Sequence, residues 1–310
     1  MKYFSMFSGI GGFEYGIQKC SLENLAPTAN RKKTTETTRD SQRQCSQHHN
    51  EHTNRFTCVG FSEVDKYATQ IYKKHFNHKE YGDVSKINWG SVEGFEILVG
   101  GFPCQAFSIA GNRKGFADTR GTLFFEIARC LKEKQPRLCV LENVKGLLSH
   151  DKGKTFGVIL AALAEVGYDV QWQVLNSKNF GVPQNRERVF IIGHLRGTSR
   201  PEVFPIGEGN SQNEKVFPTS STELAHSTGK NFMPKCCELL QEMGIKLRRL
   251  TPTECERLQG FPDGWTSEGV DGAISDTQRY KCLGNAVTTN VISAIFEKIR
   301  GGRNEDKRLS

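Results

Sequence analysis

Short apolar runs alternate with helix-type patterns along most of this chain, and this alternation is the feature that most limits its fold. Strand-like runs open the chain and recur at residues 56–65, 95–101, 137–144, 168–175 and 187–195. Helical patterns lie between them, from Phe13 onward and at residues 66–76, 122–134 and 155–167. This order predicts an α/β fold, a mostly parallel, Rossmann-like sheet with helices on both faces. Ligands of such sheets bind beyond the carboxyl ends of the strands.

Two regions interrupt the pattern. Residues 26–55 contain no Val, Ile, Leu, Met, Phe, Tyr or Trp, so we interpret residues 20–55 as a polar, disordered insertion that cannot offset its ordering entropy. Residues 194–247 lack sustained periodicity, apart from one short predicted helix in "KCCELLQEMGIK". We expect this second region to be a small domain of its own.

The C-terminal part carries clear helix signals. Thr251, Pro252 and Glu254 form the N-cap, first position and capping box of a helix that Gly260 ends. Residues 284–300 form an amphipathic pattern that predicts one helix. The expected division is a main domain at residues 1–193, a small region at 194–247, a return to the main domain at 248–300, and a frayed tail at 301–310.

Composition excludes some classes of protein. No stretch approaches the roughly 20 apolar residues of a membrane span, and the N-terminus breaks into glycines before it resembles a signal peptide, so we expect a cytoplasmic protein. Its 10 cysteines are scattered, which indicates reduced thiols. The net charge of +8 suits a polyanionic partner and suits a slightly basic enzyme equally well.

The turn "FSGIGG" after the first strand is a loop that a ligand can approach closely. Glu63 and Asp65 end the next strand, where a carboxylate can accept the ribose hydroxyls of a nucleoside cofactor. Asp83 could hold an adenine amino group or be a plain turn aspartate. The absence of G-x-G-x-x-G argues against a nicotinamide dinucleotide.

Cys104 follows two glycines and Pro103 at the end of the third strand. A lone cysteine is usually a small core residue. Here a polar, glycine-flanked loop with Arg113, Lys114 and Arg120 follows it, and a thiolate nucleophile needs such access and positive charge. The loop could act as a hinged lid.

Glu142 ends the buried strand "LCVLENV", where burial is expected to raise its pKa and make it a proton donor. The alternative is a carboxylate that caps the following helix. Arg186 and Arg188 enter the last strand two residues apart, hence on one face. They suit a carbonyl oxygen or phosphates, unless they are solvated surface arginines.

These parts match one chemical problem, the methylation of carbon 5 of cytosine. A thiolate that adds to C6 while an acid protonates N3 turns C5 into a nucleophile toward a sulfonium methyl group. The reaction needs a cysteine, a buried acid, donors for O2 and a nucleoside-cofactor site, and the sequence offers a candidate for each.

The chain resembles the DNA (cytosine-5) methyltransferase family. The resemblance rests on ordered blocks across residues 2–19, 56–193 and 248–299, which include "FSGIGGFEYG", "GGFPCQAFSIAG", "LENVKG", "FGVPQNRERVFIIG", "RRLTPTECERLQGFPDGW" and "GNAVTTNV". It implies the fold of a class I S-adenosylmethionine-dependent methyltransferase with a small target-recognition domain, which falls at residues 194–247 and is shorter than usual.

The resemblance also implies roles for individual residues. Cys104 is then the nucleophile and Glu142 the acid, Arg188 contacts a cytosine extruded from the duplex, and Arg186 and Gln184 support the site. The loop with Ser108 and Arg120 closes over the base. The residues implied to hold S-adenosyl-L-methionine are Phe7, Gly9, Gly11, Glu63, Asp83, Pro103, Leu123 and Asn285.

The expected partner is double-stranded DNA, with a cognate restriction endonuclease as a further candidate, no membrane contact and a monomeric state. Two alternatives stay open: methylation of tRNA, whose branch typically carries a Cys-Phe-Thr signature absent here, and a non-catalytic binder with a shortened recognition region. The residues Cys45, His48, His49, His52 and Cys58 match no standard zinc-finger spacing, so no metal site is predicted.

Overall fold

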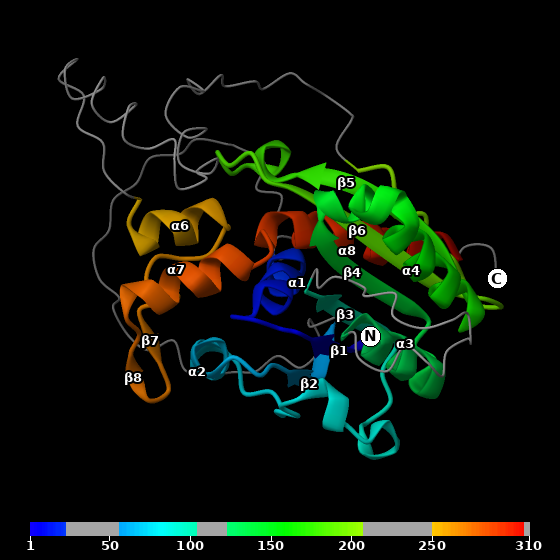
Figure 1. The fold of residues 1–310 in the computed structure, drawn as a ribbon, viewed down its shortest axis with the longest axis horizontal. Coiled ribbons are helices and arrows are strands. Elements are labelled where there is room, and N and C mark those ends of the chain that lie inside the picture. The colour runs from blue at the N-terminus through cyan, green and yellow to red at the C-terminus, as the bar shows by residue number, and fades with distance from the viewer. Residues whose placement is uncertain (23–55, 104–122, 207–249, 307–310) are drawn as a thin grey trace, which may run out of the picture.

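The computed structural model describes residues 1–22, 56–103, 123–206 and 250–306, except the side chains of residues 302–306. Within this part of the chain the centre is a six-stranded sheet in the order β2-β1-β3-β4-β6-β5 (Figure 1). Its strands are β1 (Lys2–Met6), β2 (Thr57–Ser62), β3 (Ile97–Gly101), β4 (Leu138–Val144), β5 (Tyr168–Asn176) and β6 (Glu187–Leu195). All six coincide with strands predicted from the sequence.

Parallel and antiparallel pairs divide this sheet in two. Strands β2, β1, β3 and β4 pair in parallel, whereas β6 runs antiparallel to both β4 and β5. The sheet is therefore mostly parallel, as predicted. The reversal of β6 has a direct consequence, because its first residues lie at the same edge of the sheet as the last residues of β4.

Helices cover both faces of the sheet. The strand side chains alternate, so that Phe4 and Leu98 face a core with α3 (Leu123–Lys134) and α4 (Lys154–Glu165). Tyr3 and Ile97 face the opposite core, with α1 (Gly12–Leu22) and α8 (Thr289–Asp306). Burial on both faces explains why these strands read as continuous apolar runs.

A third core joins α2 (Lys66–His75) to the C-terminal segment. That segment consists of α6 (Pro252–Leu258), the strands β7 (Glu268–Gly269) and β8 (Gly272–Ala273), and α7 (Asp276–Asn285). In Figure 1 these elements lie together at the left of the view, to the left of α1. The predicted capping box of α6 is present: Thr251 accepts from the Glu254 N–H, and Glu254 accepts from the Thr251 N–H.

Five short 3-10 helices also occur in the described part of the chain. They are η1 (Val84–Lys86), η2 (Trp89–Ser91), η3 (Lys145–Leu148), η4 (His150–Gly153) and η5 (Ser177–Phe180). None of the helices in the described ranges is long and apolar enough to cross a membrane.

The prediction of one helix over residues 284–300 is wrong at both ends. Helix α7 ends at Asn285, the backbone is extended at Ala286, and α8 begins at Thr289 and continues to Asp306, into the predicted tail. The break lets Val287 reach α1, where its side chain lies 2.8 Å from the position that a Cβ of Gly12 would take. The predicted apolar stripe is nevertheless buried; its members are Val287, Val291, Ile295 and Ile299.

Most of the polar insertion, the loop after Pro103 and most of the predicted recognition region, including the helix predicted in "KCCELLQEMGIK", lie outside the described residues. The start of the insertion is described, and it belongs to α1, which continues to Leu22.

Candidate active site

Those predicted site residues that the structure describes gather at one edge of the sheet. The carboxyl ends of β1, β2, β3 and β4 meet there, and Glu142 of β4 stands opposite Gly101 of β3 in the strand register. Arg188 of β6 stands opposite Val144 of β4 because β6 is antiparallel. The sheet therefore brings together Gly101, Glu142 and Arg188, although each lies more than 40 positions from the next in the sequence.

Glu142 forms the centre of this edge. Its side chain is 10% exposed, and its Oε1 lies 3.0 Å from Nε of Arg188. A Cβ on Gly101 would lie only 3.1 Å from Oε2 of Glu142, so the carboxyl group lies over the glycine of the strand that leads to Cys104. Burial raises the pKa of Glu142, and the nearby guanidinium groups of Arg188 and Arg186 oppose that rise.

The alternative role of Glu142 as a helix cap is wrong. The following helix, η3, has Val144 at its N-cap and no side-chain cap. Instead, Asn143 organises the strand end, since its Nδ2 donates to the carbonyl of Phe102 at 2.8 Å. This bond holds the backbone next to Pro103 against β4.

Arg186 and Arg188 are not solvated surface arginines. The Arg188 side chain is 20% exposed and pairs with Glu142. Arg186 donates to the carbonyls of Gly284 and Ala286, at 3.0 and 2.8 Å, and so ties the end of α7 to the site. Burial, together with the charge of Arg188, lowers the pKa of Arg186 to about 10.

Gln184 is 7% exposed, and its Oε1 has no hydrogen-bond partner among the described atoms. Its backbone N–H donates to the carbonyl of Val182. A buried amide oxygen without a partner is costly, which indicates that a ligand or water completes it.

The glycine turn connects β1 to α1 through left-handed backbone at Phe7, Gly9 and Gly11, with φ of 54°, 56° and 86°. The Gly9 N–H donates to Oε2 of Glu63 at 2.8 Å. A Cβ on Gly9 would meet nothing within 4 Å, whereas one on Gly11 would lie 2.3 Å from the ring of Phe76. The turn is therefore open on its Gly9 side and tightly packed on its Gly11 side.

The two acids after β2 have different environments. Oε1 of Glu63 accepts from the N–H groups of Val64 and Asp65. Asp65 caps α2 and pairs with Lys281 at 2.6 Å, which lowers the pKa of Asp65 below its usual range. Asp65 is thus committed to the fold, whereas the carboxylate of Glu63 contacts the turn at Gly9.

Val64 is a feature that the sequence reasoning missed. Its side chain is 73% exposed beside Glu63, at the carboxyl edge of the sheet. An apolar residue between two acids directly after a buried strand was the available signal. Such a side chain offers a contact surface to a flat, apolar ring.

The remaining predicted cofactor residues border the same edge. Asp83 accepts from the N–H and the hydroxyl of Ser85 as the cap of η1, which is the turn role foreseen as its alternative. Pro103 and Asn285 are exposed, and Leu123 begins α3 half-buried. Cys104, Ser108, Arg120, Arg113 and Lys114 lie outside the described residues.

Cys58 is the one member of the discounted zinc set within the described ranges. Its thiol donates to the carbonyl of Gly60 in β2, and burial raises its pKa to about 12. A thiol in this state is a poor metal ligand. No group of three or more metal-ligating side chains occurs among the described residues.

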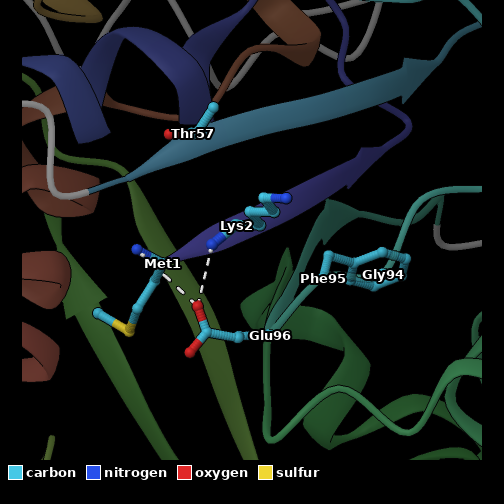
Figure 2. A pocket seen from close by; sticks show the side chains of 6 residues that line it. All are labelled: Met1, Lys2, Thr57, Gly94, Phe95 and Glu96. Carbon is cyan, nitrogen blue, oxygen red and sulfur yellow. Dashed lines mark hydrogen bonds and ion pairs between the residues drawn. The ribbon is translucent and has the colours of Figure 1, made fainter. Parts of the chain in front are cut away.

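A hollow at the opposite edge of the sheet is lined by none of the predicted site residues. Figure 2 shows it at the starts of β1 and β2 and just ahead of β3, lined by Met1, Lys2, Thr57, Gly94, Phe95 and Glu96. The carboxylate of Glu96 already accepts from the Lys2 N–H at 3.1 Å and pairs with the terminal amine at 3.8 Å. The hollow therefore lies at the amino ends of strands, away from Glu142.

An open glycine turn with a carboxylate lies at the same edge of the sheet as the buried Glu142 and the arginine paired with it, where α/β folds bind their ligands. The model of the C-5 cytosine-specific DNA methylase family matches residues 1–230 and 218–301 of this chain. The chain belongs to that family, whose members are S-adenosylmethionine-dependent enzymes.

Individual relatives agree with this assignment. The chain is 38% identical to type II methyltransferase M1.ScrFI of Lactococcus lactis subsp. cremoris, covering 80% of this chain and 73% of that protein. It is 36% identical to type II methyltransferase M.NgoBI of Neisseria gonorrhoeae, covering 94% of this chain and 91% of that protein.

Solved structures show the same fold at lower sequence identity. The Dnmt2 methyltransferase of S. pombe superposes with a TM-score of 0.65 at 18% identity, covering 96% of this chain and 97% of that one. The Entamoeba histolytica methyltransferase EhMeth gives a TM-score of 0.57 at 18% identity, with coverage of 96% and 97%. The mostly parallel sheet with helices on both faces is thus the fold of known methyltransferases.

Proposed function

We propose that this protein methylates carbon 5 of a cytosine extruded from duplex DNA, through a covalent bond between Cys104 and the base. The observation that carries the proposal is the pair between the buried Glu142 and the half-buried Arg188, at the carboxyl edge of the sheet beside the strand that leads to Cys104. Family membership supports DNA as the substrate, and the open Gly9 side of the glycine turn, at the same edge of the sheet, supports a nucleoside cofactor beside the pair.

The described residues fit S-adenosyl-L-methionine. Gly9 leaves open space where a side chain would stand, Glu63 has a carboxylate for ribose hydroxyls, and the exposed Val64 suits the adenine ring. Asp83, Pro103, Leu123 and Asn285 border the same edge and are proposed as further contacts. When bound, the cofactor supplies an electrophilic methyl group on a sulfonium centre.

Glu142 is the proposed acid. Its raised pKa favours the protonated carboxyl, which can donate to N3 of the cytosine while the Cys104 thiolate forms a bond to C6. The electron pair that this addition releases makes C5 nucleophilic, and C5 then takes the methyl group. A base, water in the simplest case, removes the C5 proton, the Cys104–C6 bond breaks, and N3 returns its proton to Glu142.

Arg188 has two proposed tasks. Its guanidinium group can donate to O2 of the cytosine, and its contact with Oε1 holds the Glu142 carboxyl in place. Arg186 holds the Gly284–Ala286 backbone, and the buried Gln184 oxygen is available to the substrate. Ser108 and Arg120 are proposed to close over the base.

A transfer assay tests the function. The protein is incubated with tritiated S-adenosyl-L-methionine and either duplex DNA or tRNA, and we expect label in DNA alone. Label in tRNA alone would favour the RNA-modifying alternative, and label in neither would favour a non-catalytic binder. Bisulfite sequencing of DNA from expressing cells then reads the modified sequence.

The covalent step is tested with matched variants. Cys104→Ser is expected to abolish transfer and retain cofactor binding, whereas Cys255→Ser, a half-buried thiol in α6, should keep wild-type activity. DNA with 5-fluorocytosine at the target should trap wild-type protein and the Cys255→Ser control, because fluorine does not leave as a proton does. Turnover by Cys104→Ser at the wild-type rate would overturn the mechanism.

Several relatives are named type II methyltransferases, and on this basis we propose a role beside a restriction endonuclease in the cytoplasm. An endonuclease that no longer cuts DNA from expressing cells is the expected partner. Cleavage of that DNA by every endonuclease encoded nearby would overturn this role.

A further inference from the structure

The carbonyl of Ile10, inside the glycine turn, is held by a residue from the far end of the chain. Nε1 of Trp265 donates to this oxygen at 3.0 Å, and both residues are buried. The first helical bond of α1 uses the carbonyl of Gly11, which accepts from the Tyr15 N–H. The Ile10 carbonyl therefore precedes the helix, and the indole is the partner that satisfies it.

The indole ring is itself fixed in place. It stacks on His75 of α2 with the ring centroids 3.6 Å apart and an interplanar angle of 7°. Nε2 of His75 also donates to the Trp265 carbonyl at 2.7 Å. Phe261 and Tyr15 pack around the same ring. A ring held this way presents its N–H in one direction.

A buried carboxylate holds the backbone on both sides of Trp265. Glu256 of α6 is fully buried and accepts from the N–H groups of Gly264 and Thr266, each at 2.7 Å. Arg279 of α7 balances its charge at 3.2 Å. The bonds to the residues before and after Trp265 make this turn a rigid mount for the indole.

We propose that Trp265 is a positioning residue for the cofactor turn. Its N–H holds the Ile10 carbonyl, and this keeps the Gly9 N–H on Glu63 and the open side of the turn toward the ligand. The inference rests on the proposed binding of S-adenosyl-L-methionine at this turn. It also ties that site to α6, which begins shortly after the predicted recognition region.

The test removes one N–H. Trp265→Phe keeps an aromatic ring and leaves the buried Ile10 carbonyl without its donor. Trp89→Phe is the matched control, because Trp89 is also buried and its Nε1 has no partner among the described atoms. Calorimetry measures the dissociation constant for S-adenosyl-L-methionine without DNA, and thermal unfolding without cofactor reports on the fold.

Trp265→Phe should weaken cofactor binding about tenfold, equivalent to about 1.4 kcal/mol, with the rate at saturating cofactor unchanged within about twofold. Trp89→Phe should bind as the wild type does. Wild-type affinity in Trp265→Phe, or an equal loss in Trp89→Phe, would overturn the inference alone. Failure of the wild-type protein to bind would instead overturn the proposed cofactor site and this inference with it.

A second variant covers the case in which Trp265→Phe does not fold. Glu256→Gln keeps the indole and weakens the bonds that hold its turn, so it should lower cofactor affinity in the same direction, by about threefold (roughly 0.7 kcal/mol). Wild-type cofactor affinity in Glu256→Gln would contradict the inference that Glu256 holds the turn that carries Trp265 in place.

Discussion

Glu14 makes the stability of this protein depend on pH in a predictable direction. It lies in the first turn of α1 and is 0% exposed. The Tyr72 hydroxyl donates to its Oε1 at 3.1 Å, and its Oε2 has no partner among the described atoms. Burial raises the pKa of Glu14 from 4.5 to about 7, and the bond from Tyr72 only partly opposes that rise.

The size of the effect follows from these two pKa values. They are about 2.5 pH units apart, and each unit is worth about 1.4 kcal/mol, so the total is about 3 kcal/mol. In the unfolded chain the carboxyl ionises above about pH 4.5, while in the folded protein it keeps its proton until about pH 7. The stability that depends on the protonated Glu14 is therefore fully present below pH 4.5 and is lost as the pH rises through 7.

The perturbation that isolates this group is Glu14→Gln, which is neutral at every pH. Urea unfolding followed by circular dichroism between pH 5 and 8 gives the free energy of unfolding of both proteins. As the pH rises from 5 to 8, the free energy of unfolding of Glu14→Gln should increase relative to that of the wild type by about 2 to 3 kcal/mol. Glu93→Gln, at an exposed carboxylate, is the control and should run parallel to the wild type. Parallel curves for Glu14→Gln would refute the reasoning.

Variants at three further positions test the site and the fold. Glu142→Gln should lower turnover by about 10²- to 10⁴-fold and leave cofactor affinity unchanged, as single-turnover kinetics and calorimetry would show; activity within threefold of wild type would exclude the acid role. Gly16→Ala should destabilise the protein by about 1 to 3 kcal/mol in urea unfolding, because its Cβ would lie 2.6 Å from Ile292 of α8. Asp65→Ala should cost about 1 kcal/mol in the same assay by removing the cap of α2, and Asp65→Asn should restore most of it.

Local patterns in the sequence were enough for much of the fold. The six strands, the glycine turn and the capping box of α6 depend on residues that are neighbours in the chain, so their signals are readable without tertiary structure. The burial of Glu142 follows in the same way from its place at the end of an apolar strand. The match of these features to one chemistry also came from the sequence.

Tertiary structure decided how those pieces meet. The antiparallel direction of β6 brings Arg188 to Glu142, and no local pattern states the direction in which a strand pairs. The split between α7 and α8 places Val287 against Gly12 of α1, a contact that no local pattern reveals. Likewise, Trp265 reads in the sequence as an ordinary core residue.

The physical reason is the separation along the chain. Helix and strand signals arise within a few residues, whereas the bond from Trp265 to Ile10 joins residues 255 positions apart. Likewise, the side chain of Asp65 accepts from Lys281, which lies 216 positions away in the sequence. Contacts of this kind depend on the order and register of the strands, which the complete packed core determines.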